Sequence, residues 1–557
     1  MADVLVLGCG PAGLMAAVEA RKRGCRVVAV DKGIIGNDCA AVGAKQLAAT
    51  GPWAVAGDSA RLHYEDTLRS GCFINNDKLA YLLASKIGPV VMALERMGMP
   101  FDRDPSGKNI QVLGPSPGHS KARSLRFSDI TGKLLVDTLY AECRRRGVEL
   151  LSEHVALDLV SGEKGVSGVL VVDLVSGELG FIRTKAVIVA TGGIGCLYEL
   201  TSNPVQNTAD GIALALRAGA ELMDLEFVQF YPVTVLFPPA IRGMNLNSHH
   251  YGAHLINVSG ERFMSRYYPE QMEHVTRDKL SQCIFEEITA GRCGPNGGVF
   301  MDATMIAAEV YAREIPSEWH LAKTAGVDLT KEKLEVAPSA HYYMGGIRID
   351  ERCRTTVPGL FAAGECCAGA QGANRLANNG LSEALVFGSI AGKNAAEYAS
   401  KAKISEYREM EFHRRVSQIE ACFDKKGSPP SALISSIRQV MTRHVGIVRE
   451  AKGLKTAVQN LQKLTEAKIA ADFGNRWDVS MLQALSARNM LLVAQGIALA
   501  ACERRESRGA HYRSDYPHMD DSNWRSNIVV TLKDHKRLTS RIEAPGSGGN
   551  FIWNVTK

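Results

Sequence analysis

The chain contains 557 residues, which is more than one hydrophobic core usually organises, so two or three domains are expected. Hydrophobic residues make up 46% and charged residues 22% of the sequence, while 53 Gly and 20 Pro stay below the level typical of disorder. The net charge is +6 without a basic block, which argues against a nucleic acid partner. These values exclude a disordered or low-complexity protein.

The sequence also lacks the usual signals of secretion and membrane insertion. Residues 1–8 contain no basic region and no signal-length apolar run, and nowhere do about 18 uncharged apolar residues run together. The 13 cysteines are scattered without a Cys-x-x-Cys motif, so we expect no disulfide scaffold, no iron–sulfur cluster and no metal site in this chain. We therefore expect a cytoplasmic protein without direct membrane insertion.

The first 190 residues predict a sheet with helices between its strands. Residues 4–7 predict a buried strand, 8–13 a turn, 14–23 a helix and 26–30 a second strand. Residues 148–180 predict strands and a hairpin, with a turn at Ser176-Gly177. Residues 186–190 predict a buried parallel strand that leads into Thr191-Gly192-Gly193.

The pattern changes twice further along the chain. Residues 238–336 predict mixed helix and loop, and residues 359–365 predict another strand and turn, so the middle resembles an insertion into the first domain. Residues 407–506 predict a bundle of long amphipathic helices, such as Met481 to Ala501. A polar tail with a strand at 527–532 closes the chain.

Gly8-Cys9-Gly10-Pro11-Ala12-Gly13 is a G-x-G-x-x-G motif between a predicted strand and a predicted helix. Gly8 permits a tight turn, Gly10 lets backbone N–H groups approach a pyrophosphate, and Gly13 lets the helix pack on the strand. Asp31, at the end of the next strand, can accept hydrogen bonds from ribose hydroxyls, and its charge disfavours a 2′-phosphate. The motif therefore predicts FAD or NAD in preference to NADP.

Three further segments favour FAD over NAD. Ala190 to Gly193, Thr208 to Gly211 and Gly364-Glu365 each offer a point where the backbone could meet an extended cofactor. A nicotinamide-binding domain does not usually return to its first sheet roughly 330 residues later, whereas a domain that wraps the longer FAD can.

Four segments together resemble the flavoprotein subunits of fumarate reductase and succinate dehydrogenase, with L-aspartate oxidase and adenylylsulfate reductase as relatives. They are Gly8 to Gly13, Ala190 to Gly193, His341 to Gly346, and Gly364-Glu365 with Gly372-Ala373-Asn374-Arg375-Leu376. The likeness covers nearly the whole chain and extends through Asn257 to Met264, Thr276-Arg277-Asp278, Arg504 to His511 and Asp520 to Trp524.

The resemblance implies an α/β fold in which a Rossmann-like FAD-binding domain is interrupted by an α+β capping domain and followed by a helical domain. The expected boundaries are 1–237 and 337–402 for the FAD-binding domain, 238–336 for the cap, 403–510 for the helical domain and 511–557 for the tail. The residues expected to bind FAD are Gly8, Gly10, Pro11, Ala12, Gly13, Asp31, Lys32, Cys39, Gly43, Ala44, Val155, Thr191, Gly192, Asp210, Gly364, Glu365, Asn374, Arg375, Leu381 and Ser382.

The resemblance fails where related enzymes attach the flavin covalently. Succinate dehydrogenases and quinol-linked fumarate reductases carry a linking His at the position of Asn37. We therefore expect non-covalent FAD, and with it a lower flavin potential that disfavours succinate oxidation.

Arg375 and His341 are the first candidates for binding an anionic substrate over the flavin. Arg offers a planar fork for an oxyanion, and His can donate from a ring nitrogen at neutral pH. Both fall at positions that bind the dicarboxylate in the resembled family.

Other parts of that family's site are replaced. Its substrate His aligns with Tyr231, its Thr-Glu pair with Asn245-Leu246, and its proton-delivering Arg with Thr304. Tyr231, Arg242 and His249 are the candidate replacements. His249 and His250 are expected on opposite sides of a strand, so at most one would face the substrate.

The sequence leaves three functions open. The first is a soluble FAD-dependent oxidoreductase that transfers a hydride between flavin N5 and a carboxylate, by C=C reduction or CH–CH dehydrogenation. The second is an enzyme similar to adenylylsulfate reductase or L-aspartate oxidase, and the third is a flavin electron-transfer subunit of a larger complex. A ferredoxin-like iron–sulfur protein is the preferred partner in each reductive case, and association into an oligomer is compatible with the sequence.

Overall fold

The computed structural model describes residues 1–162, 165–403, 409–471, 479–533 and 537–545. Its centre is a five-stranded parallel sheet with the strand order β16-β9-β1-β2-β5. The strands are β1 (Val4–Leu7), β2 (Val27–Val30), β5 (Glu149–Leu151), β9 (Ala186–Val189) and β16 (Leu360–Ala362). Because β16 pairs with β9, the chain returns to its first sheet after the intervening segment, as the sequence predicts.

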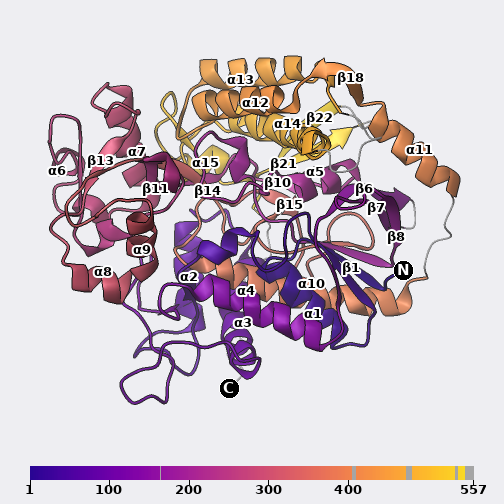
Figure 1. Ribbon diagram of the computed structural model, residues 1–557, viewed down its shortest axis with the longest axis horizontal. Helices are drawn as coiled ribbons and strands as arrows, with labels where there is room; N and C mark the ends of the chain where they lie inside the picture. Colours follow the sequence, from indigo (N-terminus) through magenta and orange to yellow (C-terminus); the bar gives the residue numbers. More distant parts are fainter. Residues whose placement is uncertain (163–164, 404–408, 472–478, 534–536, 546–557) are drawn as a thin grey trace.

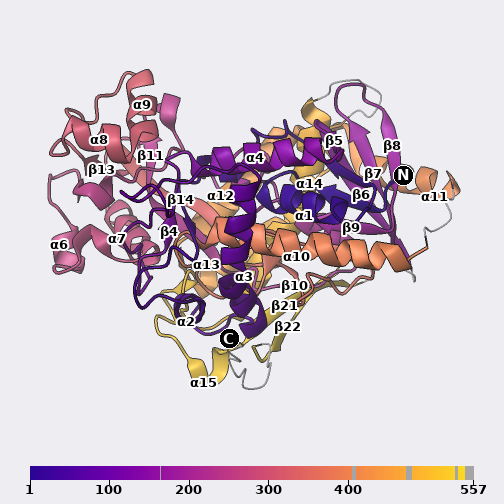
Figure 2. The same cartoon turned by 90° about the horizontal axis from the view of Figure 1, so that it is seen from below.

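Two helices, α1 (Pro11–Arg21) and α10 (Asn379–Lys401), pack on this sheet, and a third helix, α4 (Thr131–Arg145), packs on α1. α1 also contacts α10, and Figure 2 shows α1 and α10 running side by side. α1 begins at Pro11, three residues before the predicted start, because a proline at the first helical position loses no hydrogen bond and its φ is already helical.

The predicted hairpin is part of a separate antiparallel sheet of three strands. They are β6 (His154–Gly162), β7 (Gly165–Asp173) and β8 (Leu179–Arg183), and β7 pairs with both neighbours. The tight connection between β7 and β8 contains the predicted turn at Ser176-Gly177.

The segment between β10 and β15 builds a second body with its own hydrophobic core, drawn from residues between Tyr231 and Val336. Figure 1 shows it at the left of the molecule, on the side away from β1 of the parallel sheet. We call this body the cap. Its four-stranded antiparallel sheet has the order β11-β14-β13-β12, where the strands are β11 (Val228–Phe237), β14 (Leu334–Tyr343), β13 (Val299–Asp302) and β12 (His254–Ile256). The periodicity of residues 238–336, which predicts helix and loop, did not reveal these strands, whereas the α+β cap that the family resemblance implies agrees with them.

The helices of the cap are α6 (Met264–Tyr267), α7 (Arg277–Thr289), α8 (Ala308–Glu314) and α9 (Pro316–Thr324). α7 packs against β11 and β14. The predicted cap boundaries lie at the end of β11 and inside β14, the two paired strands that lead into and out of this body. The boundaries themselves stay predictions.

The predicted helical bundle consists of α12 (Pro430–His444), α13 (Ala451–Leu464) and α14 (Val479–Glu503), which contact one another. α11 (Glu409–Glu420) precedes it, together with a strand that the sequence did not predict, β18 (Phe423–Ser428). Within the described residues, one helix segment, Ser480–Glu503, is long and apolar enough to span a membrane. Of its most apolar window, 72% is buried inside the protein, so packing accounts for its composition.

A mixed sheet joins the C-terminal strands to strands on either side of the cap. Its order is β17-β15-β10-β21-β22, with β17 (Cys367–Ala368), β15 (Gly346–Arg348), β10 (Leu222–Met223), β21 (Asn527–Lys533) and β22 (Arg537–Glu543). β21 confirms the predicted strand at 527–532. The remaining elements are α2 (Ala60–Ser70), α3 (Asp77–Arg96), α5 (Asp210–Arg217), α15 (Asp521–Trp524), β3 (Leu47–Ala48), β4 (Ser124–Leu125), β19 (Val448–Arg449) and β20 (Tyr512–Arg513).

Candidate active site

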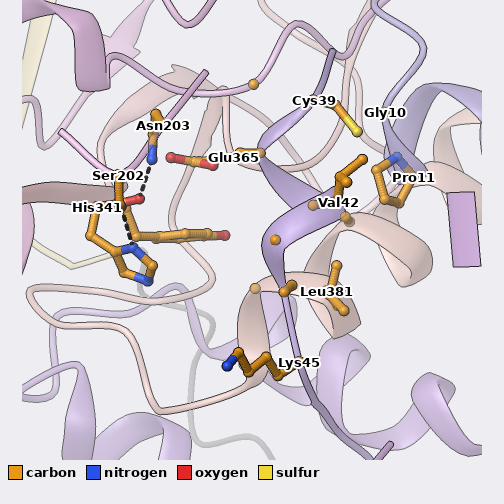
Figure 3. A pocket seen from close by; sticks show the side chains of 18 of the residues that line it. Gly10, Pro11, Cys39, Val42, Lys45, Ser202, Asn203, His341, Glu365 and Leu381 are labelled. Atoms are coloured by element: carbon orange, nitrogen blue, oxygen red, sulfur yellow. Dashed lines mark hydrogen bonds between the residues drawn. The ribbon is translucent and has the colours of Figure 1, made fainter. Parts of the chain in front are cut away.

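A cavity of about 1240 Å³ runs from the β1–α1 turn to the cap. Figure 3 shows Gly10, Pro11 and Cys39 on one side of it and His341 and Ser202 on the other. Its wall therefore joins the dinucleotide motif to the side chains predicted to bind a substrate. We call these two ends the nucleotide end and the cap end.

The backbone at the nucleotide end tolerates only glycine at two places. Gly8 has φ +94°, and a Cβ on it would lie 2.4 Å from the Ala190 carbonyl oxygen. A Cβ on Gly13 would lie 1.8 Å from the carbonyl oxygen of Gly8. The first glycine makes the turn and the last one seats α1 against it, as the motif predicts.

Asp31 holds this turn from the end of β2. Its carboxylate accepts hydrogen bonds from the backbone N–H of Cys9 at 2.6 Å and of Gly33 at 2.9 Å. Burial raises its pKa from the ordinary value, although both N–H groups oppose the shift. Asp31 also lines the cavity, where its remaining lone pairs can accept from a ribose.

Most of the predicted cofactor residues line this one cavity. They are Gly8, Gly10, Pro11, Ala12, Asp31, Lys32, Cys39, Gly43, Ala44, Val155, Thr191, Gly192, Asp210, Gly364, Glu365, Arg375 and Leu381. Lys32 forms an ion pair with Asp210, at the start of α5.

Three predicted cofactor residues lie behind the cavity wall instead. Gly13 packs on Gly8. The Ser382 hydroxyl donates to the Ala48 carbonyl at 2.6 Å, and the Asn374 side-chain oxygen accepts from Gln229 at 2.8 Å. Their contacts are with protein groups, so they shape the wall without forming part of it.

The chemistry of the wall fits FAD. Backbone N–H groups at the start of α1 face the pyrophosphate position of the motif. The Thr191 hydroxyl is buried without a hydrogen-bond partner, and a Cβ on Gly43 would meet no atom within 4 Å. An unsatisfied hydroxyl and an open stretch of backbone are both expected where a cofactor lies.

His341 forms part of the cap end, on β14. Its Nδ1 lies 2.9 Å from the Ser202 hydroxyl and 3.4 Å from the amide nitrogen of Asn245. Because an amide nitrogen can only donate, Nδ1 is the acceptor and the proton sits on Nε2. Burial, together with Arg277 and Arg375, holds the pKa of His341 well below its usual value. The ring is therefore neutral at pH 7 and can donate one hydrogen bond.

Arg375 lies beside it, with 6% of its surface exposed. Its Nη2 donates to Gln229 Oε1 at 2.8 Å, and its guanidinium stands 4.5 Å from the centre of the Tyr342 ring. Its Nε is buried without a hydrogen-bond partner. Burial and the nearby Arg277 lower its pKa to about 10, so it stays charged at pH 7.

Arg277, on the first turn of α7, is a cavity residue that the sequence interpretation did not select. Its Nη1 is buried and unpartnered, and its guanidinium lies 5.0 Å from the centre of the Tyr231 ring. Thr304, the position to which the proton-delivering Arg was assigned, is exposed and donates to Asp302 at 2.7 Å, outside the cavity wall. Thr304 therefore does not face the cavity, whereas Arg277 does. The Thr276-Arg277-Asp278 segment was the signal in the sequence that could have selected Arg277 as a candidate.

The three proposed replacement residues occupy different places. Tyr231 lines the cavity, but its hydroxyl lies 3.1 Å from both the Leu246 carbonyl and Asn247 Oδ1, so its ring is the part that faces Arg277. Arg242 is exposed outside the cavity wall and donates to the Leu236 carbonyl. The prediction that Arg242 faces the substrate was wrong, because Arg242 follows the short 3-10 helix Pro239–Ile241 and is exposed to solvent.

His249 and His250 lie on a 3-10 helix, Ser248–Tyr251, and not on a strand. Their ring centres are 3.9 Å apart. His250 lines the cavity, whereas His249 is buried behind it against Tyr231. One histidine faces the cavity as expected, but it is the other of the two.

Further polar residues at the cap end carry no recognisable motif. Lys45 Nζ is buried without a hydrogen-bond partner, 3.7 Å from Asp129 and 3.8 Å from Glu318. Asp129 belongs to the FAD-binding part and Glu318 to α9 of the cap, so this cluster joins the two bodies. No periodicity or spacing in the sequence brings these positions together.

Comparisons with known proteins agree on this architecture. Residues 3–381 match the family described as FAD binding domain, and residues 435–544 match the family described as fumarate reductase flavoprotein C-term. The chain is 37% identical to an uncharacterized FAD-dependent oxidoreductase of Methanocaldococcus jannaschii, over 95% of this chain and 96% of that protein.

Two further relatives carry named activities. One is a component of the fumarate reductase (CoM/CoB) of Methanothermobacter marburgensis, 34% identical over 97% of this chain and 98% of its own length. The solved structure of E. coli quinol fumarate reductase superposes with a TM-score of 0.90 at 28% identity, over 98% of this chain and 97% of that chain.

Proposed function

Because the chain belongs to the flavoprotein family of fumarate reductases and succinate dehydrogenases, and is thus an FAD-dependent oxidoreductase, we propose that its substrate is a small carboxylate. The reaction is reduction of a C=C bond or dehydrogenation of a CH–CH bond. Bound FAD supplies hydride donor and acceptor chemistry at N5.

One observation carries the proposal: two arginines stand in the cap end without a salt bridge to any described carboxylate. Each of them, Arg277 and Arg375, also has a buried guanidinium nitrogen without a hydrogen-bond partner. A desolvated cation is costly unless an anion completes it, so the pair favours an anionic ligand. The neutral His341 adds a hydrogen-bond donor beside them.

Each residue of the cap end has a separate role in substrate binding or proton transfer, which follows from its position. Arg375, held by Gln229 and Tyr342, binds and orients a carboxylate, and His341 Nε2 donates to the same group. Arg277 is the proton donor in reduction of a C=C bond, because it is the charged donor that lies over Tyr231 across the cap end. The cap covers this end of the cavity and limits the access of water.

The flavin is bound without a covalent link. Asn37 occupies the position of the linking His, and it is exposed outside the cavity wall, whereas Asp38 and Cys39 line it. An amide offers no nucleophile for flavin attachment. Acid precipitation of the purified protein is expected to release its FAD completely into the supernatant.

Electrons reach the flavin from a separate iron–sulfur protein. Support comes from relatives whose names describe them as subunits, namely those of a fumarate reductase (CoM/CoB) and of an 8-methylmenaquinol:fumarate reductase. A small ferredoxin-like protein is the preferred class of partner.

The test is an anaerobic mixing experiment. The FAD of the holoprotein is reduced chemically, and return of the oxidised absorption band is followed after addition of fumarate, larger unsaturated carboxylates, adenylylsulfate or iminosuccinate. We expect reoxidation by at least one unsaturated carboxylate, its loss in Arg375→Ala, and full activity in Arg242→Ala. Reoxidation by adenylylsulfate alone, or equal rates in Arg375→Ala and wild type, would contradict the proposal.

A further inference from the structure

Behind Arg375 lies a row of side chains that reaches away from the cavity. The Tyr342 hydroxyl donates to Glu383 Oε2 at 2.6 Å, and the Gln371 amide donates to the same oxygen at 2.9 Å. Tyr342 and Arg375 line the cavity, whereas Glu383 does not. Glu383 is 3% exposed, so a carboxylate that touches no ligand is buried next to the anion-binding arginine.

The Tyr342 ring is fixed between two neighbours. A Cβ on Gly380 would lie 2.9 Å from Tyr342 Cε2, so the ring already rests on the backbone at the start of α10. On its other side the Arg375 guanidinium lies 4.5 Å from the ring centre. The hydroxyl is held by Glu383, one turn further along α10. The position of the ring, and with it that of the guanidinium, thus depends on this hydrogen bond.

The titratable and charged groups around Glu383 come from four parts of the chain. Tyr342 faces it from β14, Arg375 from the loop before α10, Glu365 from the loop after β16, and Cys367 from β17. Tyr342 and Cys367 stay neutral at pH 7, because burial raises the pKa of both groups well above their ordinary values. The charges that change near neutral pH are therefore the two carboxyl groups, and Arg375 is the cation that both of them face.

Burial raises the pKa of Glu383 to about 7 and that of Glu365 to about 8. Each carboxyl group therefore gains its negative charge as the pH rises through the neutral range. A negative charge beside Arg375 weakens the attraction of that arginine for a ligand anion. Anion binding should consequently strengthen as the pH falls.

We propose that Glu383, acting through Tyr342, is a positioning residue for Arg375 and that its protonation tunes the affinity of the site for carboxylates. The inference rests on the proposed function, since it assumes that Arg375 binds the substrate carboxylate. It adds that carboxylate binding by Arg375 is controlled by pH through a residue on α10 that lies outside the cavity.

The test uses the oxidised holoprotein and malonate, a dicarboxylate that the flavin cannot reduce or oxidise at a C=C bond. Malonate binding is followed from pH 6 to pH 9 through the change in the flavin absorption spectrum. In the wild type we expect the malonate Kd to rise about threefold to tenfold over this range. This is the change expected when the carboxylate charge near Arg375 and the bound anion shift each other's equilibrium by up to about one pKa unit. In Glu383→Gln the rise should become smaller, because only Glu365 still gains a charge over this range, while the value at pH 6 is kept.

Glu95→Gln serves as the matched control, because Glu95 pairs with Arg103 at the surface, outside the cavity wall. It should reproduce the wild-type profile. A Glu383→Gln profile equal to that of the wild type would overturn the inference and leave the proposed function intact. If malonate does not perturb the wild-type flavin at any pH, the anion site itself is absent, and the proposed function and this inference both fail.

Tyr342→Phe decides the matter if Glu383→Gln does not retain FAD. The substitution keeps the ring under Arg375 and removes only the hydroxyl that reaches Glu383. We expect it to raise the malonate Kd at pH 8 about threefold to tenfold, because one hydrogen bond is lost. It should also raise the substrate KM more than it lowers kcat. An unchanged Kd in this variant would overturn the inference.

Discussion

The nucleotide end of the cavity is formed by the backbone of one continuous β-α-β unit, whereas the cap end is formed by side chains from separate segments. At the first, Gly8, Gly13 and Asp31 lie within the first 31 residues. At the second, Arg277 and His341 are brought together by α7 and β14 of the cap, far apart in the chain. The nucleotide end therefore depends on main-chain geometry, whereas the cap end depends on side chains from separate segments.

The two ends also differ in how their polar groups are satisfied. The Asp31 carboxylate already accepts two backbone hydrogen bonds, whereas Arg277 and Arg375 keep unpartnered nitrogens. The nucleotide end should therefore respond to substitution through folding and FAD content, and the cap end through catalysis. Three substitutions separate these effects, and a fourth tests the buried His63, which belongs to neither end.

Gly13→Ala should have the largest effect, because its Cβ would lie 1.8 Å from the Gly8 carbonyl oxygen. Overpacking usually costs about 1–3 kcal/mol and more where backbone must move, so we expect a protein that unfolds earlier and holds little FAD. The measurements are the FAD-to-protein ratio and the unfolding midpoint. Gly453→Ala in α13, whose Cβ would meet nothing nearer than 3.4 Å, should keep its FAD. Full FAD content in Gly13→Ala would refute the close packing.

Arg277→Gln should lower the rate of substrate reduction by about 10²–10⁴, the usual contribution of a positioned proton donor, without loss of FAD. Single-turnover reoxidation of the reduced flavin measures it. Thr304→Ala is the control, because Thr304 lies outside the cavity and should keep the wild-type rate. If Thr304→Ala were slow and Arg277→Gln had the wild-type rate, Arg277 would not be the proton donor, and position 304, which the sequence alignment indicated first, would be favoured instead.

Asp31→Asn should weaken FAD binding about tenfold to a hundredfold, since one charge-assisted hydrogen bond to the turn is lost. Titration of the apoprotein with FAD gives the Kd. Asp350→Asn removes a carboxylate that also accepts two backbone N–H groups, but outside the cavity. Equal FAD affinity in the two variants would show that Asp31 only shapes a loop.

His63 gives the smallest effect, and it appears only in acid. The side chain is fully buried on α2 and shares a hydrogen bond with Asn379 at 2.8 Å, and burial lowers its pKa to about 3. Between pH 6.5 and 3 the unfolded chain binds the proton and the folded chain does not, so stability falls as the pH drops, by up to about 1.4 kcal/mol per pH unit. His63→Gln should reduce this loss. Chemical unfolding at pH 7 and pH 5 measures it, and an identical loss in the variant would exclude His63 as a source.

The nucleotide end could be predicted from the sequence because its signals are local. The glycine spacing, the flanking strand and helix, and Asp31 all lie within one unit, and the structure places them as expected. The strand Leu360–Ala362, which pairs with β9, could also be predicted, because a short apolar run before Gly364-Glu365 indicates a buried strand.

The cap end could be predicted only in part. His341 and Arg375 lie in recognisable segments, but Arg242 and His249 were chosen by their place in the chain, and the 3-10 helices at or beside these positions leave no periodic pattern. Periodicity did not reveal the cap strands β12 and β13 because they have only three and four residues. Strands that short fall below the length at which alternation can be recognised.

The most direct test of the anion site is calorimetric titration of the oxidised holoprotein with dicarboxylates, fumarate first, in the wild type and in Arg277→Gln. The oxidised flavin cannot reduce the ligand, so binding is measured without turnover. We predict that one dicarboxylate binds for each FAD. In Arg277→Gln the Kd should be about tenfold higher or more, because one charged hydrogen-bond donor is lost. Absence of binding for every dicarboxylate, or an equal Kd in the two proteins, would contradict an anion site built on Arg277 and Arg375.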